Sequence, residues 1–129
     1  MSWTLTPLRY PGGKDQLHKF VANLIELNEI KNGTYVEPFS GGAGVSIRLL
    51  LNNAVEKIVI NDYDPSIHAF WYSILNYTDK FIDEIESTPV TIEEWSNQKN
   101  IYNEFHNESK SFENGFATFF LESHVFYWF

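Results

Sequence analysis

The segment Thr34 to Gly44, TYVEPFSGGAG, constrains the fold of this chain more than any other. Tyr35 and Val36 favour a β-strand, and Pro38 cannot continue a central strand because it has no backbone N–H. Residues 45–51 are mostly apolar and predict a buried helix. Between strand and helix, the backbone can turn tightly beneath a ligand at Gly41, Gly42 and Gly44. A strand, a glycine-rich turn and a helix N-terminus are the elements that hold nucleotide-like cofactors in open α/β sheets.

The composition predicts one globular domain. The chain has 129 residues, of which 43% are hydrophobic, which is ample for a core. It has no cysteine, so disulfides and thiolate metal sites are excluded, and no metal site is expected. The sequence has neither an apolar run of about 18 residues nor a signal-peptide pattern, which predicts a cytoplasmic protein without a membrane partner.

The distribution of charge limits where DNA could bind. The formal net charge is -8, whereas nucleic-acid binding depends mainly on neutralising phosphates. Residues 78–129 contain ten acidic residues and three lysines. The evident basic cluster is Arg9, Lys14 and Lys19, so any DNA contact is expected to depend on it.

Beyond the opening motif, the pattern predicts a second strand, Lys57 to Asp62, and several helices. Asp64 and Pro65 are expected at the start of one helix, and Thr91 with Glu94 forms a capping box for another. The first helix is predicted to begin at about Asp15 and to end before Asn32. The others are predicted from Pro65 to about Asn76, from about Asp79 to Glu86, from Thr91 onward, and from Phe112 to Leu121.

Asp62 is a candidate ligand-binding residue, because it follows the second strand about 20 residues after the glycines. Its two carboxylate oxygens match the vicinal hydroxyls of a ribose. The alternative is that Asn61 or Asp62 simply begins the next turn. We favour the ligand, because Asp64 is better placed to cap the following helix.

Two familiar phosphate-binding motifs are incomplete here, which weakens the dinucleotide interpretation and rules out a P-loop. The dinucleotide fingerprint requires a small residue at position 47, which is Ile47. A P-loop around Gly12, Gly13 and Lys14 would require Gly at Leu8 and Ser or Thr at Asp15. From spacing alone, Lys14 fits a solvated N-terminal turn as well as a ligand site.

Three segments, RYPGGK at 9–14, VEPFSGGAG at 36–44 and INDYD at 60–64, together resemble one family. In order and separation they resemble the N6-adenine DNA methyltransferases of bacteria and phages, the type that methylates GATC and serves restriction systems. The resemblance spans about residues 5–121. It implies an α/β fold, an incomplete Rossmann-like S-adenosylmethionine-dependent methyltransferase core with a helical extension. Residues 1–77 would bind S-adenosylmethionine, and residues 78–129 would begin the helical target-recognition domain.

The resemblance also implies the residues of the cofactor site. Tyr10 and Lys14 would contribute an aromatic ring and a cation, and Asp62 would hold the ribose. The amino-acid part of S-adenosylmethionine would be cradled by Glu37, Pro38, Phe39, Ser40, Gly41 and Gly42.

The chain departs from the family in its catalytic motif. Catalysis in the family depends on an Asp-Pro-Pro-Tyr type motif, whereas the prolines here stand at 7, 11, 38, 65 and 89 and none are adjacent. We therefore expect a truncated N-terminal portion with no catalytic residues, inactive alone and with weak or absent binding to double-stranded DNA. Its uncovered apolar surface is expected to cause self-association.

Other interpretations remain open. The chain could be a non-catalytic S-adenosylmethionine-binding module, or one subunit of a split methyltransferase; a nicotinamide-dependent oxidoreductase is a third candidate. One codon choice for residues 122–129, shifted by one base, reads Asn-Arg-Thr-Cys-Phe-Ile-Gly, which is similar to the family's continuation. This pattern is expected if a frameshift after Leu121 truncated a longer methyltransferase.

Overall fold

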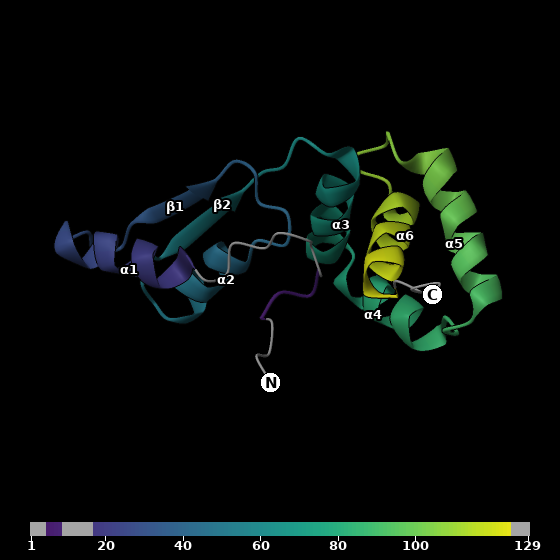
Figure 1. Ribbon diagram of the computed structural model, residues 1–129, viewed down its shortest axis with the longest axis horizontal. Coiled ribbons are helices and arrows are strands. Elements are labelled where there is room, and N and C mark those ends of the chain that lie inside the picture. Colours follow the sequence, from purple (N-terminus) through teal and green to yellow (C-terminus); the bar gives the residue numbers. More distant parts are fainter. Residues whose placement is uncertain (1–4, 9–16, 125–129) are drawn as a thin grey trace, which may run out of the picture. The chain divides into compact units, whose positions relative to one another are not determined.

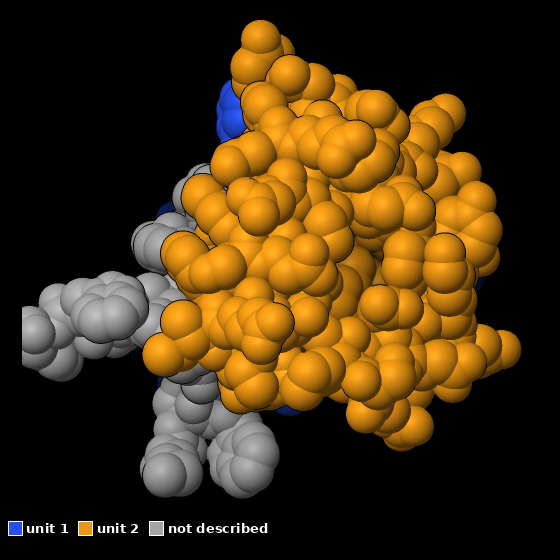
Figure 2. Space-filling view, turned by 90° about the vertical axis from the view of Figure 1, so that its right-hand side faces the viewer, with its two compact units in different colours: residues 1–62 blue, residues 63–129 orange. Residues whose placement is uncertain are grey.

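The computed structural model describes residues 5–8 and 17–124 of the 129-residue chain. The chain forms two compact units, residues 1–62 and 63–129 (Figure 2). The predicted boundary between Tyr77 and Thr78 lies inside the second unit. The assignment of residues 1–77 to cofactor binding and of residues 78–129 to target recognition stays a prediction.

The first unit contains a two-stranded parallel sheet. Strand β1 (Thr34–Glu37) pairs with β2 (Lys57–Ile60), with Thr34 opposite Lys57 and Glu37 opposite Ile60 (Figure 1). The helices are α1 (His18–Leu27) and α2 (Gly44–Leu51). Strand β2 ends at Ile60, two residues before the predicted end at Asp62, and beyond it Asn61 N donates to Glu37 O and Asn61 O accepts from Ser40 N, both at 2.9 Å.

The two faces of this sheet have different surroundings. Tyr35 packs against the core of Val45, Leu49 and Val55, whereas Val36 and Val59 on the opposite face are 58% and 41% exposed. This alternation follows from the period of two in a strand, and it places the helices of the unit on one side. Self-association through the exposed apolar residues stays a prediction.

The second unit is helical in the part of the chain that the structure describes. Its helices are α3 (Pro65–Asn76), α4 (Thr78–Ser87), α5 (Ile92–Phe105) and α6 (Phe112–Ser123), and α6 contacts both α3 and α5 (Figure 1). These four helices confirm the predicted ones, with ends shifted by a few residues.

The predicted helix caps are largely confirmed. Asp64 Oδ1 accepts a hydrogen bond from Ser66 N at 2.8 Å, and Pro65 is the first residue of α3. Thr91 Oγ1 accepts from Glu94 N at 3.0 Å. The returning half of the capping box is absent among the hydrogen bonds of the described residues, because the Glu94 carboxylate accepts from Gln98 Nε2 at 2.8 Å instead.

The core of the second unit is aromatic. The Phe81 ring lies with its centroid 5.5 to 5.9 Å from the centroids of four other rings, and all four pairs are edge-to-face. Such pairs are preferred by the ring quadrupoles and add to the free energy of burial. The four partners are Phe70, Phe112, Phe116 and Phe119. In the residues that are described, no helix is long and apolar enough to span a bilayer.

We predict that Gly115→Ala destabilises the second unit by about 1–3 kcal/mol, the usual cost of overpacking a core. The added Cβ would lie 2.5 Å from the Ala69 carbonyl oxygen and 2.6 Å from Ser73 Oγ. The backbone of α3 would therefore have to move away from α6. Urea unfolding followed by circular dichroism measures the effect.

Gly33→Ala is the matched control. Its Cβ would approach Ile30 Cγ2 at 2.8 Å, but that side chain is 50% exposed and can rotate away. We expect little change in the free energy of unfolding. If Gly115→Ala were as stable as the wild type, the close approach of α3 and α6 would be contradicted.

Candidate functional site

The connection from β1 to α2 is a tight loop, residues 38–43, which we call the glycine loop. Gly41 and Ala43 have positive φ angles of 47° and 52°, and Ala43 N donates to Ser40 O at 2.6 Å. Gly41 and Gly42 are buried. The sequence predicted the turn from its glycines but not the left-handed alanine, because a non-glycine residue in this conformation requires support from its surroundings.

Part of that support comes from the segment after β2. Gly41 N donates to Asp62 Oδ2 at 2.8 Å, and Ser40 N donates to Asn61 O at 2.9 Å. Asn61 Nδ2 also donates to Pro38 O at 3.3 Å. Asp62 therefore braces the glycine loop, a role that the sequence did not predict. Its contact with a ribose stays a prediction.

At the end of β1, the carboxylate of Glu37 is enclosed. The residue is 7% exposed, and its Oε2 accepts a hydrogen bond from Ser46 Oγ in the first turn of α2. Ser46 is fully buried. A buried carboxylate is costly unless it is hydrogen-bonded, so this contact explains how Glu37 is tolerated there.

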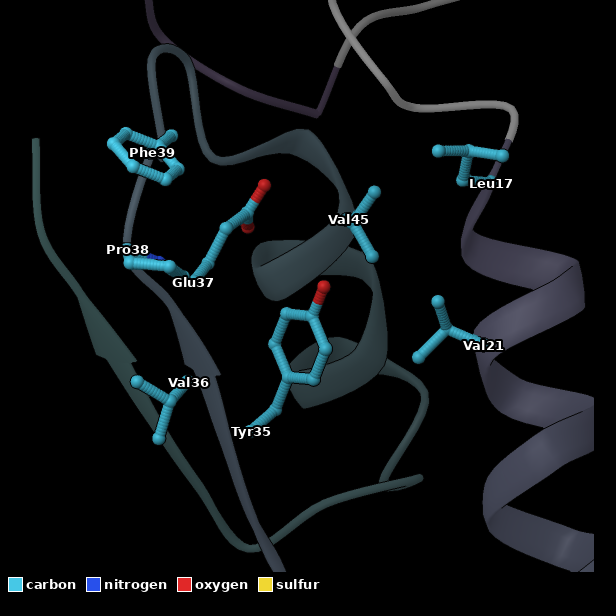
Figure 3. Close-up of a pocket in the computed structure, with 8 residues that line it drawn as sticks. All are labelled: Leu17, Val21, Tyr35, Val36, Glu37, Pro38, Phe39 and Val45. Atoms are coloured by element: carbon cyan, nitrogen blue, oxygen red, sulfur yellow. The ribbon is translucent and has the colours of Figure 1, made fainter.

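Glu37 borders a cleft with a volume of about 250 Å³ (Figure 3). The Tyr35 hydroxyl and the Glu37 carboxylate both point into the space between β1, α2 and α1. Burial and, to a smaller extent, the negative charge of Glu37 raise the pKa of Tyr35 above 10.0. The remaining lining residues are Leu17, Val21, Val36, Pro38, Phe39 and Val45. A mostly apolar cleft with one carboxylate suits a ligand that has both an apolar part and a positively charged group.

Ser40 adds a hydroxyl that has no hydrogen-bond partner in the described part of the chain. Its Oγ atom is buried. Buried hydroxyls are nearly always hydrogen-bonded in folded proteins, so an unsatisfied one within a glycine-rich loop fits a ligand-binding position. Two carboxylates that accept hydrogen bonds and a hydroxyl that can donate or accept suit a ligand with cationic and hydroxyl groups.

The structure brings most of the predicted site residues together. At the carboxyl ends of β1 and β2, it places Glu37, Pro38, Phe39, Ser40, Gly41, Gly42 and Asp62. Phe39 is 70% exposed there. Tyr10 and Lys14 lie outside the described residues. Among the described residues, no group of three or more His, Asp or Glu side chains could hold a metal ion.

Three residues at this site were missed by sequence reasoning. Tyr35 lines the cleft, and Ser46 donates a hydrogen bond to Glu37. The third residue is Thr6, and its hydroxyl donates to the carbonyl oxygen of Gly42. Ser46 gave one usable signal, a lone hydroxyl between apolar residues of a helix predicted to be buried. Thr6 gave none, because its partner is distant in the sequence.

We predict that Glu37→Gln lowers the pKa of Tyr35 toward 10.0, because the substitution removes the negative charge that disfavours the phenolate. The pKa remains above that value, since burial is the larger cause. A pH titration by NMR of the chain labelled at tyrosine Cζ measures this, with the Tyr35 signal assigned by its loss in Tyr35→Phe. Because the pKa is raised by folding, ionisation of Tyr35 destabilises the fold, and its stabilising contribution is lost as the pH rises above about 10.

The exposed Glu56 provides the control, because Glu56→Gln removes the same charge elsewhere in the first unit. It should leave the Tyr35 titration unchanged. If Glu37→Gln also left it unchanged, the two side chains would not share the cleft.

Comparisons with known proteins give the family of this chain. Residues 10–126 match the family model described as D12 class N6 adenine-specific DNA methyltransferase. The chain is 33% identical over 84 residues to the Type II methyltransferase M.MjaIII of Methanocaldococcus jannaschii, covering 62% of this chain but 28% of that relative. No solved structure matches. The frameshift after Leu121 stays a prediction. The chain belongs to the D12 class N6 adenine-specific DNA methyltransferase family.

Proposed function

We propose that this chain is the S-adenosylmethionine-binding part of a site-specific adenine DNA methyltransferase. The observation that carries the proposal is the pair of carboxylates, Glu37 and Asp62, on either side of a buried glycine loop at adjacent strand ends. Membership of the family supports the proposal, and so does the name of the Type II methyltransferase relative, which also fits a role in restriction and modification.

The chemistry of the site suits this cofactor better than a nucleotide phosphate. S-adenosylmethionine has no phosphate, and when bound it supplies an electrophilic methyl group on its sulfonium. Glu37 would accept hydrogen bonds from the ammonium group and Asp62 from the ribose hydroxyls. The Ser40 hydroxyl, unsatisfied among the described residues, would gain a partner on binding. By resemblance, Tyr10 and Lys14 would complete the site.

One strand–helix–strand unit of the fold supports the assignment to a methyltransferase core. β1, α2 and β2 form a parallel strand–helix–strand crossover, the element from which Rossmann-like sheets are assembled. We propose that the sheet is the beginning of such a core. The family resemblance would then place target recognition in residues 78–129.

For DNA, we propose weak or absent binding by this chain alone. Its three lysines after residue 77 each lie over an aromatic ring, with Lys80 Nζ 3.8 Å from the Phe112 ring centroid. Ten acidic residues surround them in the sequence. Such a region repels a phosphate backbone more than it attracts one.

Transfer to adenine would require groups that this chain lacks. The base must be extruded from the duplex and its amine held in line with the methyl group. By resemblance, the acceptors for that amine belong to the Asp-Pro-Pro-Tyr type motif, and the sequence contains no adjacent prolines. The residues of this chain would therefore bind and orient the cofactor without completing the reaction.

We predict that the purified 129-residue chain binds S-adenosylmethionine in calorimetry but transfers no labelled methyl to mixed-sequence DNA. An active adenine methyltransferase assayed in parallel controls for the DNA and the label. Methyl incorporation by this chain would contradict its inactivity. Binding of NAD in preference to S-adenosylmethionine would contradict the proposed function and favour an oxidoreductase.

A second prediction concerns Asp62. Asp62→Ala should weaken S-adenosylmethionine binding by about 1.5–3 kcal/mol, the scale of a hydrogen bond to a charged group. Because Asp62 also accepts a hydrogen bond from Gly41 N, the alanine variant loses both the contact with the cofactor and a contact that stabilises the glycine loop. Asp62→Asn keeps an acceptor for Gly41 N but loses the charge and the second carboxylate oxygen, so it should weaken binding while preserving the melting temperature.

Asp64→Asn is the matched control, because asparagine also caps a helix and Asp64 is engaged at the start of α3. It should leave the affinity for S-adenosylmethionine unchanged. If Asp62→Asn also bound with the affinity of the wild type, Asp62 would have only its role in the glycine loop.

A further inference from the structure

We propose that Ser46 is a positioning residue that fixes the Glu37 carboxylate for the ammonium group of the cofactor. The observation is the hydrogen bond from Ser46 Oγ to Glu37 Oε2, a contact between two buried side chains. The inference rests on the proposed function, since it assigns the amino-acid end of S-adenosylmethionine to Glu37.

Ser46 forms this contact in the interior of the first unit. Ser46 lies in the first turn of α2, between Val45 and Ile47, and its neighbours Val45 and Leu49 belong to the core. The residue is fully buried, so the hydroxyl has no access to water. Losing its one carboxylate partner would leave a buried polar group unsatisfied.

Glu37 accepts hydrogen bonds at two points, one on its backbone and one on its side chain. Its carbonyl oxygen accepts from Asn61 N at 2.9 Å, which fixes the backbone at the end of β1. Ser46 fixes the far end of the side chain. A glutamate side chain has several rotatable bonds, so a ligand that met an unrestrained carboxylate would have to immobilise it at a cost in entropy.

The contact also leaves the carboxylate suitable for a cation. The hydrogen bond uses Oε2, and Oε1 accepts no hydrogen bond from the residues that the structure describes. The carboxylate faces the cleft beside Tyr35 (Figure 3). An ammonium group there would form a charge-assisted hydrogen bond, which is stronger than a neutral one. Ser46 would thus act on binding through Glu37 and not by touching the cofactor.

Two ligands separate this role from a general effect on the fold. S-adenosylhomocysteine carries the amino-acid group, whereas 5′-methylthioadenosine has the same nucleoside and thioether without it. We expect Ser46→Ala to weaken S-adenosylhomocysteine binding about tenfold, the scale of one net hydrogen bond. Binding of 5′-methylthioadenosine should stay within about twofold of the wild type. Calorimetry on the full chain measures both affinities, and Ser46→Thr, which keeps the hydroxyl, should restore the first.

Ser73→Ala is the matched control, because Ser73 is also a fully buried helical serine but its Oγ has no hydrogen-bond partner among the described residues. It should change neither affinity. Circular dichroism and melting temperatures establish that each variant folds, and Ser46→Thr keeps the test valid if Ser46→Ala does not.

The outcomes separate this inference from the function on which it rests. If the wild type and Ser46→Ala bound S-adenosylhomocysteine equally well, the positioning role of Ser46 would be overturned. The proposed function would stand. Equal losses for both ligands would also overturn the positioning role, since they would show a general effect on the glycine loop. A wild-type chain that binds neither ligand would overturn the proposed function and this inference together.

Discussion

The parallel pairing of β1 with β2 determines the arrangement of the site. With Glu37 opposite Ile60, the two strands end side by side, and the segments that follow them leave the sheet at the same edge. The backbone bonds between Asn61 and Glu37, and between Ser40 and Asn61, extend this pairing into the glycine loop. Two carboxylates that are distant in the sequence consequently border one loop. Ligands of α/β sheets bind at this edge for the same geometric reason.

The glycine loop combines backbone strain with several restraints. Ala43 holds a left-handed conformation that costs free energy in a residue with a Cβ, and it persists only where the surroundings compensate. Asp62, Asn61 and Thr6 all form hydrogen bonds with the loop backbone. These restraints hold the loop backbone in one conformation, and a loop that is already ordered loses less conformational entropy if it binds a ligand. Ser46 restrains the Glu37 side chain in the same way.

The second unit is stabilised by different interactions. Its core depends on phenylalanine rings around Phe81 and on the close approach of α6 to α3, which only glycine allows at position 115. Burial and the nearby Asp64 raise the pKa of Glu122 within this unit. His68 Nδ1 donates to the Ser109 carbonyl oxygen at 2.6 Å, which ties the start of α3 to the segment before α6. These contacts are those of a packed scaffold, and none of them resembles a ligand site.

The sequence alone determined most of the helices and strands of this protein and the residues that lie at the ends of its two strands. Local signals were sufficient for the strands, for the helix caps at Asp64 and Thr91, and for the segment with Glu37 and the glycines, because propensity, capping and turn formation act over a few residues. Tertiary structure decided what depends on distant partners. Only the folded chain shows Asp62 bound to Gly41, Ser46 bound to Glu37, and Gly115 against Ala69. The physical reason is that a hydrogen bond or a steric contact depends on distance in space, which a single sequence does not record.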